Sequence, residues 1–399
     1  MLKPVNHNER YAELDALRGF ALFGILLANL CSFFGYSTLS PIEIVHLPDA
    51  DRAILFMIDW IVEGKFYSIF SMLFGMGFAL QSMKIEDNME DFSCFWFRRM
   101  KLLLCFGILH MLLIWHGDIL TLYSLMGMVL IFFVNFSHRA LLISAITLLL
   151  LPLVMHIIVT ITQDSSFWMI ASEASRSFKE NLGYGDLSLL EMRTSENPLE
   201  VFFINIIKAT GRPMSYLQTG RIPQVLGMFL LGVYFIKSWR LKKYGSSALI
   251  KNWRIFFSIG VVFSFGYAWT KLHIGTPYAL DAFGMIQALI YHISAPCFAL
   301  GIVGAFFHLW QNDKTQKPLT LFVPLGKMAL SNYIMQNTIG MLIFFGYGLA
   351  LMGQVPFVFV PIFAVFILLI QWLFCSFWLA RFEQGPLEYI WRKYAYRNY

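Results

Sequence analysis

Residues 14–21 read LDALRGFA and begin an apolar run that continues to Asn29. Asp15 and Arg18 lie three residues apart in this stretch, and in a helix that spacing puts a carboxylate and a guanidinium on one face. At a membrane boundary the two groups can pair, lie among lipid headgroups or hold a phosphorylated ligand. The stretch therefore predicts a first transmembrane helix that starts with either an orienting anchor or a ligand site.

The composition indicates an all-α protein that crosses a membrane several times. Hydrophobic residues make up 58% of the 399 residues and charged residues only 14%, which is too little polar surface for a water-soluble protein of this length. No small-residue cleavage pattern follows the first apolar run, so we expect this run to remain as a transmembrane helix. The five cysteines lie singly without a CxxC pair, which predicts neither a disulfide framework nor a metal site.

Apolar runs long enough to cross a bilayer predict about ten transmembrane helices. They cover residues 16–36, 53–81, 101–115, 119–136, 140–161, 222–236, 255–270, 280–309, 321–349 and 355–379. If the N-terminus is cytoplasmic, nineteen Lys and Arg residues fall in the inner loops and termini and eight in the outer loops. The positive-inside rule then predicts that both termini are cytoplasmic. The net charge of +6 follows from this topology and does not indicate a nucleic-acid partner.

The chain is interpreted as one membrane domain with three parts. Residues 1–161 hold the first five predicted helices and residues 222–399 hold the last five. Residues 162–221 are the one long polar segment, predicted to form an extracytoplasmic cap. Within it, residues 198–207 are apolar but short, which suggests an interfacial or re-entrant segment, or an eleventh span.

Charged side chains interrupt the second predicted helix, where lipid would not tolerate them. Asp59 and Glu63 share a face one turn apart if the helix is continuous, and Lys65 follows directly. Lys65 could pair with either carboxylate simply to neutralise it. Alternatively, the three side chains form the polar wall of a central cavity.

Histidine and aspartate come together where the third and fourth predicted helices meet. His110 lies about one and a half turns from the outer end of its helix, and His116 and Asp118 lie in a very short outer turn. An imidazole beside a carboxylate is the usual general base at neutral pH. Asp118 could orient His116, or it could cap the helix that it precedes. His46, in the first outer loop, is a third candidate imidazole.

Several motifs resemble one group of membrane enzymes. The LDALRGFA stretch resembles the first helix of the transmembrane acyltransferase superfamily, which includes the acyltransferase-3 enzymes and the lysosomal heparan-glucosaminide N-acetyltransferases. Across almost the whole chain, the sequence is similar to the bacterial DUF418 group of YeiB-like proteins. This similarity rests on residues 63–71 (EGKFYSIFS), His110 with residues 115–120 (WHGDIL), residues 326–336 (GKMALSNYIMQ) and residues 385–392 (GPLEYIWR).

The resemblance implies an enzyme of the bacterial cytoplasmic (inner) membrane that takes an acyl group, such as acetyl, from cytoplasmic acyl-CoA. The acceptor would be a small molecule, a lipid or a glycan at or beyond the outer face. Cationic groups are needed for the CoA phosphates, and the expected region comprises Asp15, Arg18, Arg98, Arg99 and Lys327. Arg98 and Arg99 could instead be ordinary positive-inside charges.

One departure from the family pattern concerns the catalytic histidine. Acyltransferase-3 enzymes commonly carry it eleven residues after the motif arginine, where this chain has Asn29. The N-acetyltransferase branch also has asparagine there, with its catalytic histidine in the following outer loop, and this makes His46 the counterpart by position. His110 is the second candidate base. Either histidine would be oriented by Asp59 or Asp118.

Amide side chains inside the predicted helices complete the candidate site. Asn29, Asn332 and Gln336 could donate hydrogen bonds to the oxyanion of an acyl-transfer reaction, or they could only bond neighbouring helices. The residues expected to line the substrate cavity are Asn29, Glu63, Lys65, His116, Asn332 and Gln336.

A transporter is the alternative function. About ten helices with buried Asp, Glu, Lys and His residues would also suit proton-coupled transport of a small polar solute. Binding of acyl-CoA would favour the enzyme, whereas uptake driven by a pH gradient would favour the transporter. In both cases the chain lies in the lipid bilayer, and it could form a homodimer.

Overall fold

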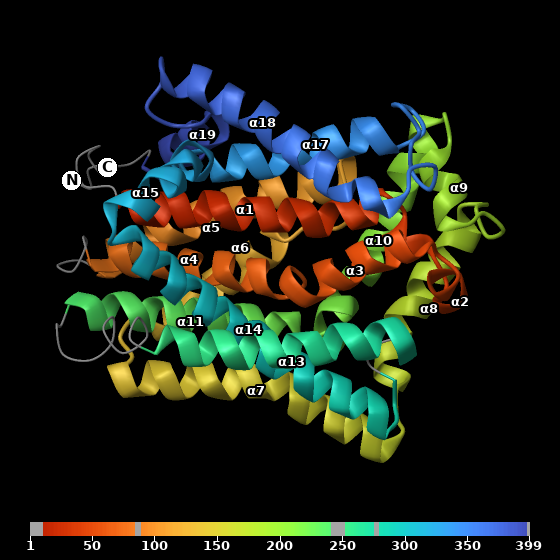
Figure 1. Cartoon of the computed structure of the whole chain (residues 1–399), viewed down its shortest axis with the longest axis horizontal. Coiled ribbons are helices and arrows are strands. Elements are labelled where there is room, and N and C mark those ends of the chain that lie inside the picture. Colours follow the sequence, from red (N-terminus) through yellow and green to blue (C-terminus); the bar gives the residue numbers. More distant parts are fainter. Residues whose placement is uncertain (1–10, 84–88, 241–251, 275–278, 397–399) are drawn as a thin grey trace.

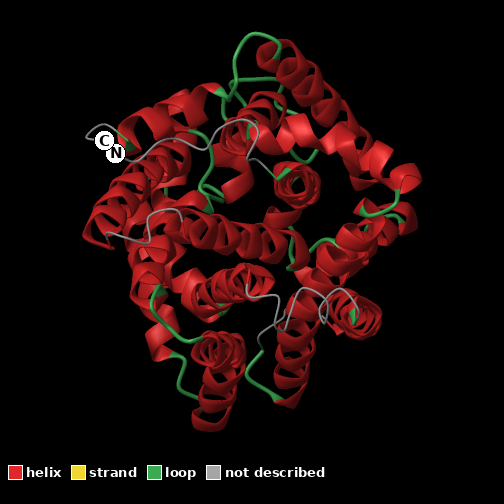
Figure 2. Cartoon of the chain, turned by 90° about the vertical axis from the view of Figure 1, so that its left-hand side faces the viewer, coloured by secondary structure: helices red, strands yellow, loops and turns green. Residues whose placement is uncertain are grey.

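The computed structural model describes residues 11–83, 89–240, 252–274 and 279–396. The described residues form helices and connecting loops, and none of them forms a β-strand (Figure 2). The helices are α1 (Ala12–Phe33), α2 (Pro41–Val45), α3 (Asp49–Ile61), α4 (Lys65–Ser82), α5 (Met89–Leu113), α6 (Leu120–Leu130), α7 (His138–Thr162), α8 (Ser166–Asn181), α9 (Leu189–Thr194), α10 (Pro198–Gln218), α11 (Arg221–Arg240), α13 (Trp253–Ile274), α14 (Ala282–Trp310), α15 (Asp313–Leu319), α16 (Val323–Lys327), α17 (Ala329–Phe344), α18 (Val360–Leu379) and α19 (Pro386–Ala395). Seven of the positive charges behind the predicted topology lie outside the described residues: Lys3, Arg10, Lys84, Lys242, Lys243, Lys251 and Arg397.

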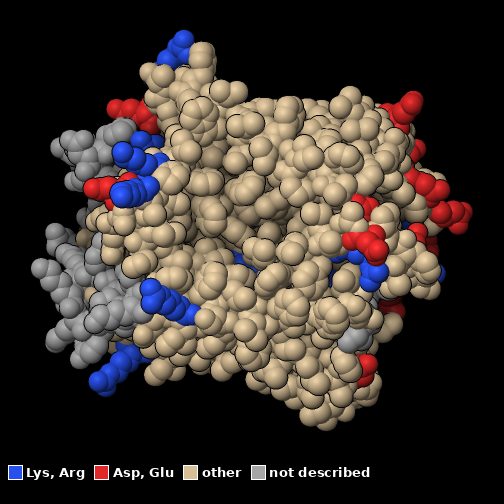
Figure 3. Space-filling view, viewed as in Figure 1, with Lys and Arg blue, Asp and Glu red and all other residues tan. Residues whose placement is uncertain are grey.

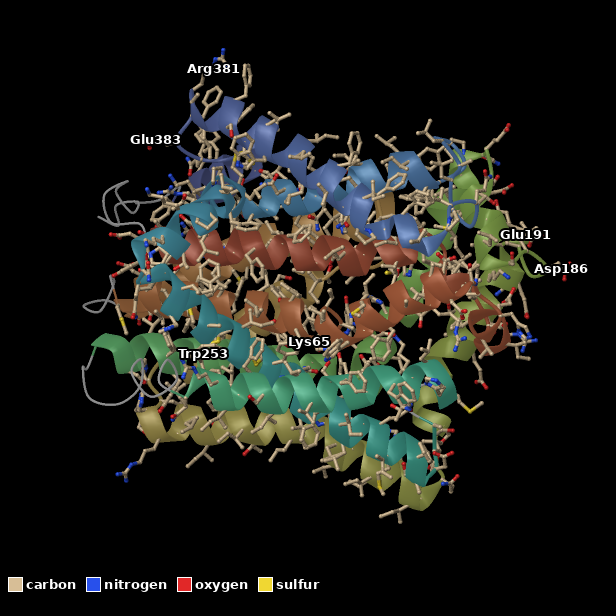
Figure 4. All side chains as sticks on the ribbon, in the orientation of Figure 1. Lys65, Asp186, Glu191, Trp253, Arg381 and Glu383 are labelled. Carbon is tan, nitrogen blue, oxygen red and sulfur yellow. The ribbon has the colours of Figure 1, made fainter. Side chains whose placement is uncertain are left out.

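The long helices run roughly parallel to the longest dimension of the molecule (Figure 1). The start of α1 lies with α19 at one end of this bundle, and α8, α9 and α10 lie at the other end (Figure 1). We call residues 162–221, which hold α8, α9 and α10, the cap. The labelled side chains follow the same division, because Arg381 and Glu383 lie near the first end and Asp186 and Glu191 at the cap end (Figure 4).

Five of the described helices are long and apolar enough to cross a membrane, namely α1, α7, α13, α14 and α18. The pair of α10 and α11 makes a sixth such segment if it is counted as one span, with a bend of 64°. In α7, α13 and α18 only 17%, 22% and 28% of the apolar window is buried, as expected for helices that face lipid, whereas in α1 and α14 the share is 61%. These features indicate a membrane protein.

The expectation of one continuous helix over residues 53–81 is wrong. α3 ends at Ile61 and α4 begins at Lys65. Between them Gly64 has a φ angle of 83°, in the left-handed region that favours glycine. A Cβ at Gly64 would also come within 2.9 Å of the Tyr291 hydroxyl on α14. Because the helix stops there, Glu63 does not share a helix face with Asp59.

Two other predicted segments also differ from the structure. Residues 321–349 form the separate helices α16 and α17, which meet at Met328. The apolar stretch at residues 198–207 is not a short piece but the first half of the 21-residue helix α10. Hydropathy alone missed its length because Lys208 and Arg212 make the second half amphipathic.

The first helix lies at the centre of the packing. α1 contacts α4, α16, α17 and α18, and most of its side chains are buried. It crosses α16 so closely that a Cβ at Gly326 would collide with the carbonyl oxygen of Asp15. This crossing sets Lys327 against the same cavity as Asp15 and Arg18.

Candidate functional site

A buried histidine–aspartate pair lies between α5 and α6. Nδ1 of His110, near the end of α5, lies 3.0 Å from Oδ1 of Asp118, and both side chains are fully buried. The other oxygen of Asp118, Oδ2, accepts a hydrogen bond of 2.6 Å from the backbone N–H of Thr121. Asp118 therefore caps the first turn of α6 and pairs with His110 at the same time.

Asparagine side chains lie on the Nε2 side of the His110 imidazole. Asn337 on α17 donates from Nδ2 to Nε2 of His110 over 2.9 Å, and Asn29 on α1 donates to Oδ1 of Asn337 over 3.0 Å. Because the Nδ2 group of an amide can only donate, Nε2 is the acceptor in this contact, and Nδ1 faces Asp118. We call His110, Asp118 and Asn337 the dyad network.

Two tyrosines fix the surroundings of the pair. The hydroxyl of Tyr216, on α10, donates a hydrogen bond to the backbone carbonyl of Asp118. The ring of Tyr333 packs against the imidazole of His110 with the ring centres 5.1 Å apart. Both contacts come from helices distant in sequence, and they keep the short α5–α6 turn in position.

A cavity of about 300 Å³ begins beside the first turn of α1 and reaches residues that neighbour this pair, although neither His110 nor Asp118 lines it. At one end it is lined by Asp15 and Arg18, and at the other by Leu120 and Tyr333, which border the pair. Its remaining polar and aromatic lining includes Gln81, Trp96, Arg99, Tyr123, Lys327, Glu388, Trp391 and Arg392.

The cationic side chains at the α1 end of the cavity differ in what neutralises their charge. Arg18 forms an ion pair of 2.7 Å with Asp15, as their spacing allows. The guanidinium of Arg99 lies 3.8 Å from the ring centre of Trp391, and its Nε has no hydrogen-bond partner among the described residues. Arg98 does not line the cavity, and it contacts Cys94 instead. Of the two neighbouring arginines, only Arg99 therefore belongs to the site.

Glu388 closes this end of the cavity and was missed from the sequence. Its carboxylate accepts hydrogen bonds from the backbone N–H groups of Leu330 and Ser331, at 2.7 Å and 3.0 Å, and from the Ser331 hydroxyl at 2.5 Å. It thereby caps the start of α17 from a separate helix, α19. Burial raises the pKa of Glu388 above the ordinary value.

The charged side chains of the second predicted helix form other contacts than expected. Oδ1 of Asp59 lies 2.5 Å from Nζ of Lys271, and Glu63 lies 3.5 Å from Arg221. Lys65, in the middle of the bundle (Figure 4), donates to the backbone carbonyl of Asp59 over 2.8 Å. Of the two alternatives, the described residues do not show an ion pair of Lys65 with either carboxylate, because cations more distant in sequence pair with both acids. Asp59 also does not contact any of the candidate histidines.

His46 and His116 lie apart from the dyad network. His46 is exposed at the end of α2, where its Nδ1 contacts the carbonyl of Ile42 at 2.7 Å. His116 contacts Arg193 at 2.8 Å and not Asp118, since His110 and Thr121 already occupy the carboxylate of Asp118. Of the candidate imidazoles, His110 alone is paired with an acid in the described structure.

The predicted amides divide into three environments. Asn29 joins the dyad network, whereas Asn332 donates to the carbonyl of Leu325 and its own carbonyl accepts from Gln371, which ties α16 and α18 to α17. Gln336 is fully buried, and neither polar atom of its side chain has a partner among the described residues. Asn337, one residue beyond the recognised motif, was missed; its signal was an amide in an apolar helix.

The C-terminal part of the chain matches a known family. Residues 238–398 match DUF418, described as a protein of unknown function. This region includes Lys327, Asn337 and Glu388, so it supplies one wall of the site.

Similar proteins cover the whole chain. The uncharacterized protein YxaH of Bacillus subtilis (strain 168) is 29% identical over 407 residues, spanning 100% of this chain and 97% of its own length. The uncharacterized protein YeiB of Escherichia coli (strain K12) is 27% identical over 98% of this chain and 97% of its own length. An uncharacterized 39.9 kDa protein of Bacillus acidopullulyticus is 26% identical over 100% of this chain. No solved structure matches the chain.

Proposed function

We propose that this chain is a bacterial membrane acyltransferase, which takes an acyl group from acyl-CoA and gives it to an acceptor that approaches from the cap end. The observation that carries the proposal is the extent of one cavity. It joins the cationic side chains at the start of α1 to Leu120 and Tyr333, which border His110 and Asp118. Acyl transfer needs a base at the reacting carbonyl and cations for the CoA phosphates.

His110 is the general base in this mechanism. Asp118, with Oδ1 3.0 Å from Nδ1, orients the imidazole, and Nε2 takes the proton from the hydroxyl or amine of the acceptor. The acceptor atom then forms a bond to the thioester carbonyl carbon. When the tetrahedral intermediate collapses, the C–S bond breaks and CoA leaves as a thiol with the proton from His110. Between the two steps Asp118 stabilises the imidazolium.

Asn337 is the oxyanion donor in the proposed mechanism. Its Nδ2 group lies 2.9 Å from Nε2 of His110, where the acceptor must bind. An acceptor that displaces this amide leaves its N–H groups free beside the reacting carbonyl. One oxyanion donor typically contributes about 10²–10³-fold to the rate of acyl transfer.

Acyl-CoA enters by the end of the cavity that holds Arg18, Arg99 and Lys327. No carboxylate pairs with Arg99 or Lys327 among the residues that the structure describes, so both are free to bind phosphate oxygens. A volume of about 300 Å³ is at the small end for ligand sites. This volume suits the narrow acyl-pantetheine arm of acyl-CoA. The nucleotide of CoA then lies at the mouth of the cavity.

The proposal sets the start of α1 and α19 on the cytoplasmic side of the inner membrane and the cap outside. On the face shown in Figure 3, Lys and Arg side chains lie mainly at the end of the bundle that holds α19 and the start of α1. Asp and Glu side chains lie mainly at the cap end. This asymmetry supports cytoplasmic termini by the positive-inside rule. The helices α4, α5, α6 and α17 then join the longer helices to give about ten spans.

Binding of acyl-CoA tests the donor site. Purified protein in a neutral detergent is titrated with acetyl-CoA and with a long-chain acyl-CoA by calorimetry. We expect Arg18→Ala and Lys327→Met to weaken binding by about tenfold or more, whereas Arg98→Met, outside the cavity, has the wild-type affinity. If the wild-type protein binds no acyl-CoA and instead drives solute uptake into liposomes under a pH gradient, the enzyme is rejected.

The ion pairs inside the bundle favour proton-coupled transport as the second candidate. Asp59 with Lys271 and Glu63 with Arg221 are acid–base pairs in the bundle, next to Lys65. Intramembrane charges of this kind commonly mark proton or solute pathways. In a transporter, Asp59→Asn abolishes uptake and acyl-CoA has no effect on stability.

A further inference from the structure

A second cavity lies in the cap, at the end of the bundle opposite Arg18. Its volume is about 480 Å³, and it is lined by α8, α10, the start of α9 and His116 of the α5–α6 turn. The charged side chains that line it are all cations: Arg176, Lys179, Lys208 and Arg212. We call this the cap pocket. No carboxylate lines it among the described residues.

The face of the cap end shown in Figure 3 does not share this charge. Asp186 and Glu191 lie on its surface (Figure 4), and acidic side chains predominate at this end of the face in Figure 3. The cations of the cap pocket are therefore a local feature. They do not belong to a generally basic surface.

Three of the four cations have no carboxylate partner among the described residues, and one of these, Lys179, donates to the backbone carbonyls of Gly185 and Leu187 instead. Lys208 and Arg212 are four residues apart on α10, so their like charges lie on one face and repel. Neither forms an ion pair with a described residue. The guanidinium of Arg212 lies 4.7 Å from the ring centre of Tyr216, and its Nε has no hydrogen-bond partner among the described residues. Arg176, by contrast, pairs with Glu180 at 2.9 Å.

A further cation without a carboxylate partner lies behind His116. Arg193 is fully buried and donates from Nη2 to Nδ1 of His116 over 2.8 Å. Its Nε and Nη1 have no hydrogen-bond partner in the described part of the chain. A buried guanidinium without a counter-ion is costly, and a bound anion would offset that cost.

We infer that the cap pocket binds a phosphate group, carried either by a soluble molecule or by a lipid headgroup. A phosphate offers several acceptor oxygens and up to two negative charges, which match Lys208 and Arg212 with the Arg193–His116 pair behind them. The volume leaves room for more than the phosphate alone.

This inference goes beyond acyl transfer and does not depend on it. The pocket does adjoin the dyad network, because His116 is two residues from Asp118 and α10 also supplies Tyr216, which holds the Asp118 carbonyl. A ligand in the cap pocket therefore contacts the same turn that positions His110.

Binding of two phosphate probes tests the inference and separates the two sources. Inorganic pyrophosphate is titrated into full-length protein in a neutral detergent. Separately, protein in neutral-detergent micelles is compared with protein in the same micelles with added phosphatidylglycerol, with diacylglycerol as the phosphate-free control, and the shift in unfolding temperature is measured. Saturable binding of pyrophosphate indicates a soluble ligand, and stabilisation only by phosphatidylglycerol indicates a headgroup.

Matched variants distinguish the pocket from general charge effects. The double variant Lys208→Met/Arg212→Gln is expected to weaken either interaction by about tenfold or more. The control Lys314→Met/Lys317→Met removes the same charge from exposed positions on α15 and is expected to bind as the wild type does. The double variant Lys208→Arg/Arg212→Lys keeps the charge and is expected to retain binding.

A measurement on the wild-type protein covers the case in which a variant does not fold. Amine acylation by a soluble reagent is followed by mass spectrometry with and without the probe that binds. We expect the probe to slow labelling of Lys208 and to leave Lys314 unchanged. Binding of neither probe, equal weakening in both charge-removing variants, or equal labelling of Lys208 with and without the probe would overturn the inference.

Discussion

Nδ2 of Asn337 lies 2.9 Å from Nε2 of His110, although the two residues are 227 positions apart in the chain. Together with Asp118 beside the other nitrogen, Asn337 orients a fully buried imidazole. In the proposed reaction the acceptor must take the place of this amide at Nε2. The contact therefore joins the base and the oxyanion donor in one arrangement.

Replacing the base is the most direct test of the proposed reaction. We expect His110→Gln to lower the rate of CoA thiol release by about 10²–10⁴-fold while acyl-CoA still binds, because only proton transfer is lost. Asp118→Asn is expected to lower the rate as well, since it removes the partner of Nδ1. His46→Ala is the control, because His46 is exposed and apart from the site. An effect of His46→Ala equal to that of His110→Gln would contradict the assignment.

Asn337 and Asn332 should have different roles although they lie on one helix. Asn337→Ala is expected to reduce kcat by about 10²-fold with an unchanged KM for acyl-CoA, since a transition-state donor is removed. Asn332→Ala is expected to lower the unfolding temperature instead, because its bonds tie α16 and α18 to α17. Steady-state kinetics and thermal unfolding of both variants check this. Equal kcat in the wild type and Asn337→Ala counts against the oxyanion role.

The ion pair of Asp59 and Lys271 should show strong coupling in a double-mutant cycle. Both side chains are mostly buried, so Asp59→Asn leaves the Lys271 charge without its partner and is expected to cost about 3–5 kcal/mol. Adding Lys271→Met is expected to recover part of this loss. The free energy of unfolding is measured by denaturant titration in mixed micelles. Simple additivity of the two single effects would show that the pair is not coupled.

The close crossing of α1 and α16 predicts a stability effect at Gly326. Gly326→Ala forces the new Cβ against the carbonyl oxygen of Asp15 and is expected to destabilise the protein by about 1–3 kcal/mol. Gly77→Ala is the control, because a Cβ there would have no atom within 4 Å. Thermal unfolding in detergent compares the two variants. A loss of stability that is no greater at Gly326 than at Gly77 would show that the crossing can relax.

The contact between His116 and Arg193 should make the cap sensitive to acid. Burial, followed by the charge of Arg193, holds the pKa of His116 well below its usual 6.5. Below about pH 6.5 the unfolded chain therefore takes up a proton that the folded chain does not, so stability falls as the pH is lowered. His116→Gln keeps an acceptor for Arg193 but does not titrate. Its unfolding temperature is expected to fall less than that of the wild type between about pH 7.5 and 5, and parallel pH profiles would disprove the effect.

Features set by neighbouring residues were predictable from the sequence. Apolar runs predicted helices able to cross a membrane, and the spacing of Asp15 and Arg18 allowed the ion pair that the structure contains. The position of Asp118 before an apolar run likewise allowed its cap on Thr121. Hydropathy and capping depend on residues within one or two turns, which the sequence displays directly.

Which charges meet across the bundle was decided only by the tertiary structure. Asp59 and Glu63 lie close to Lys65 in sequence, yet they pair with Lys271 on α13 and Arg221 at the start of α11, which lie against the break between α3 and α4. Asp118 likewise pairs with His110 on the preceding helix and not with the nearer His116. Helical periodicity settles which residues share a face. The close crossings of α1, α4 and α17 with their neighbours settle which faces meet, and no local pattern in the chain encodes that.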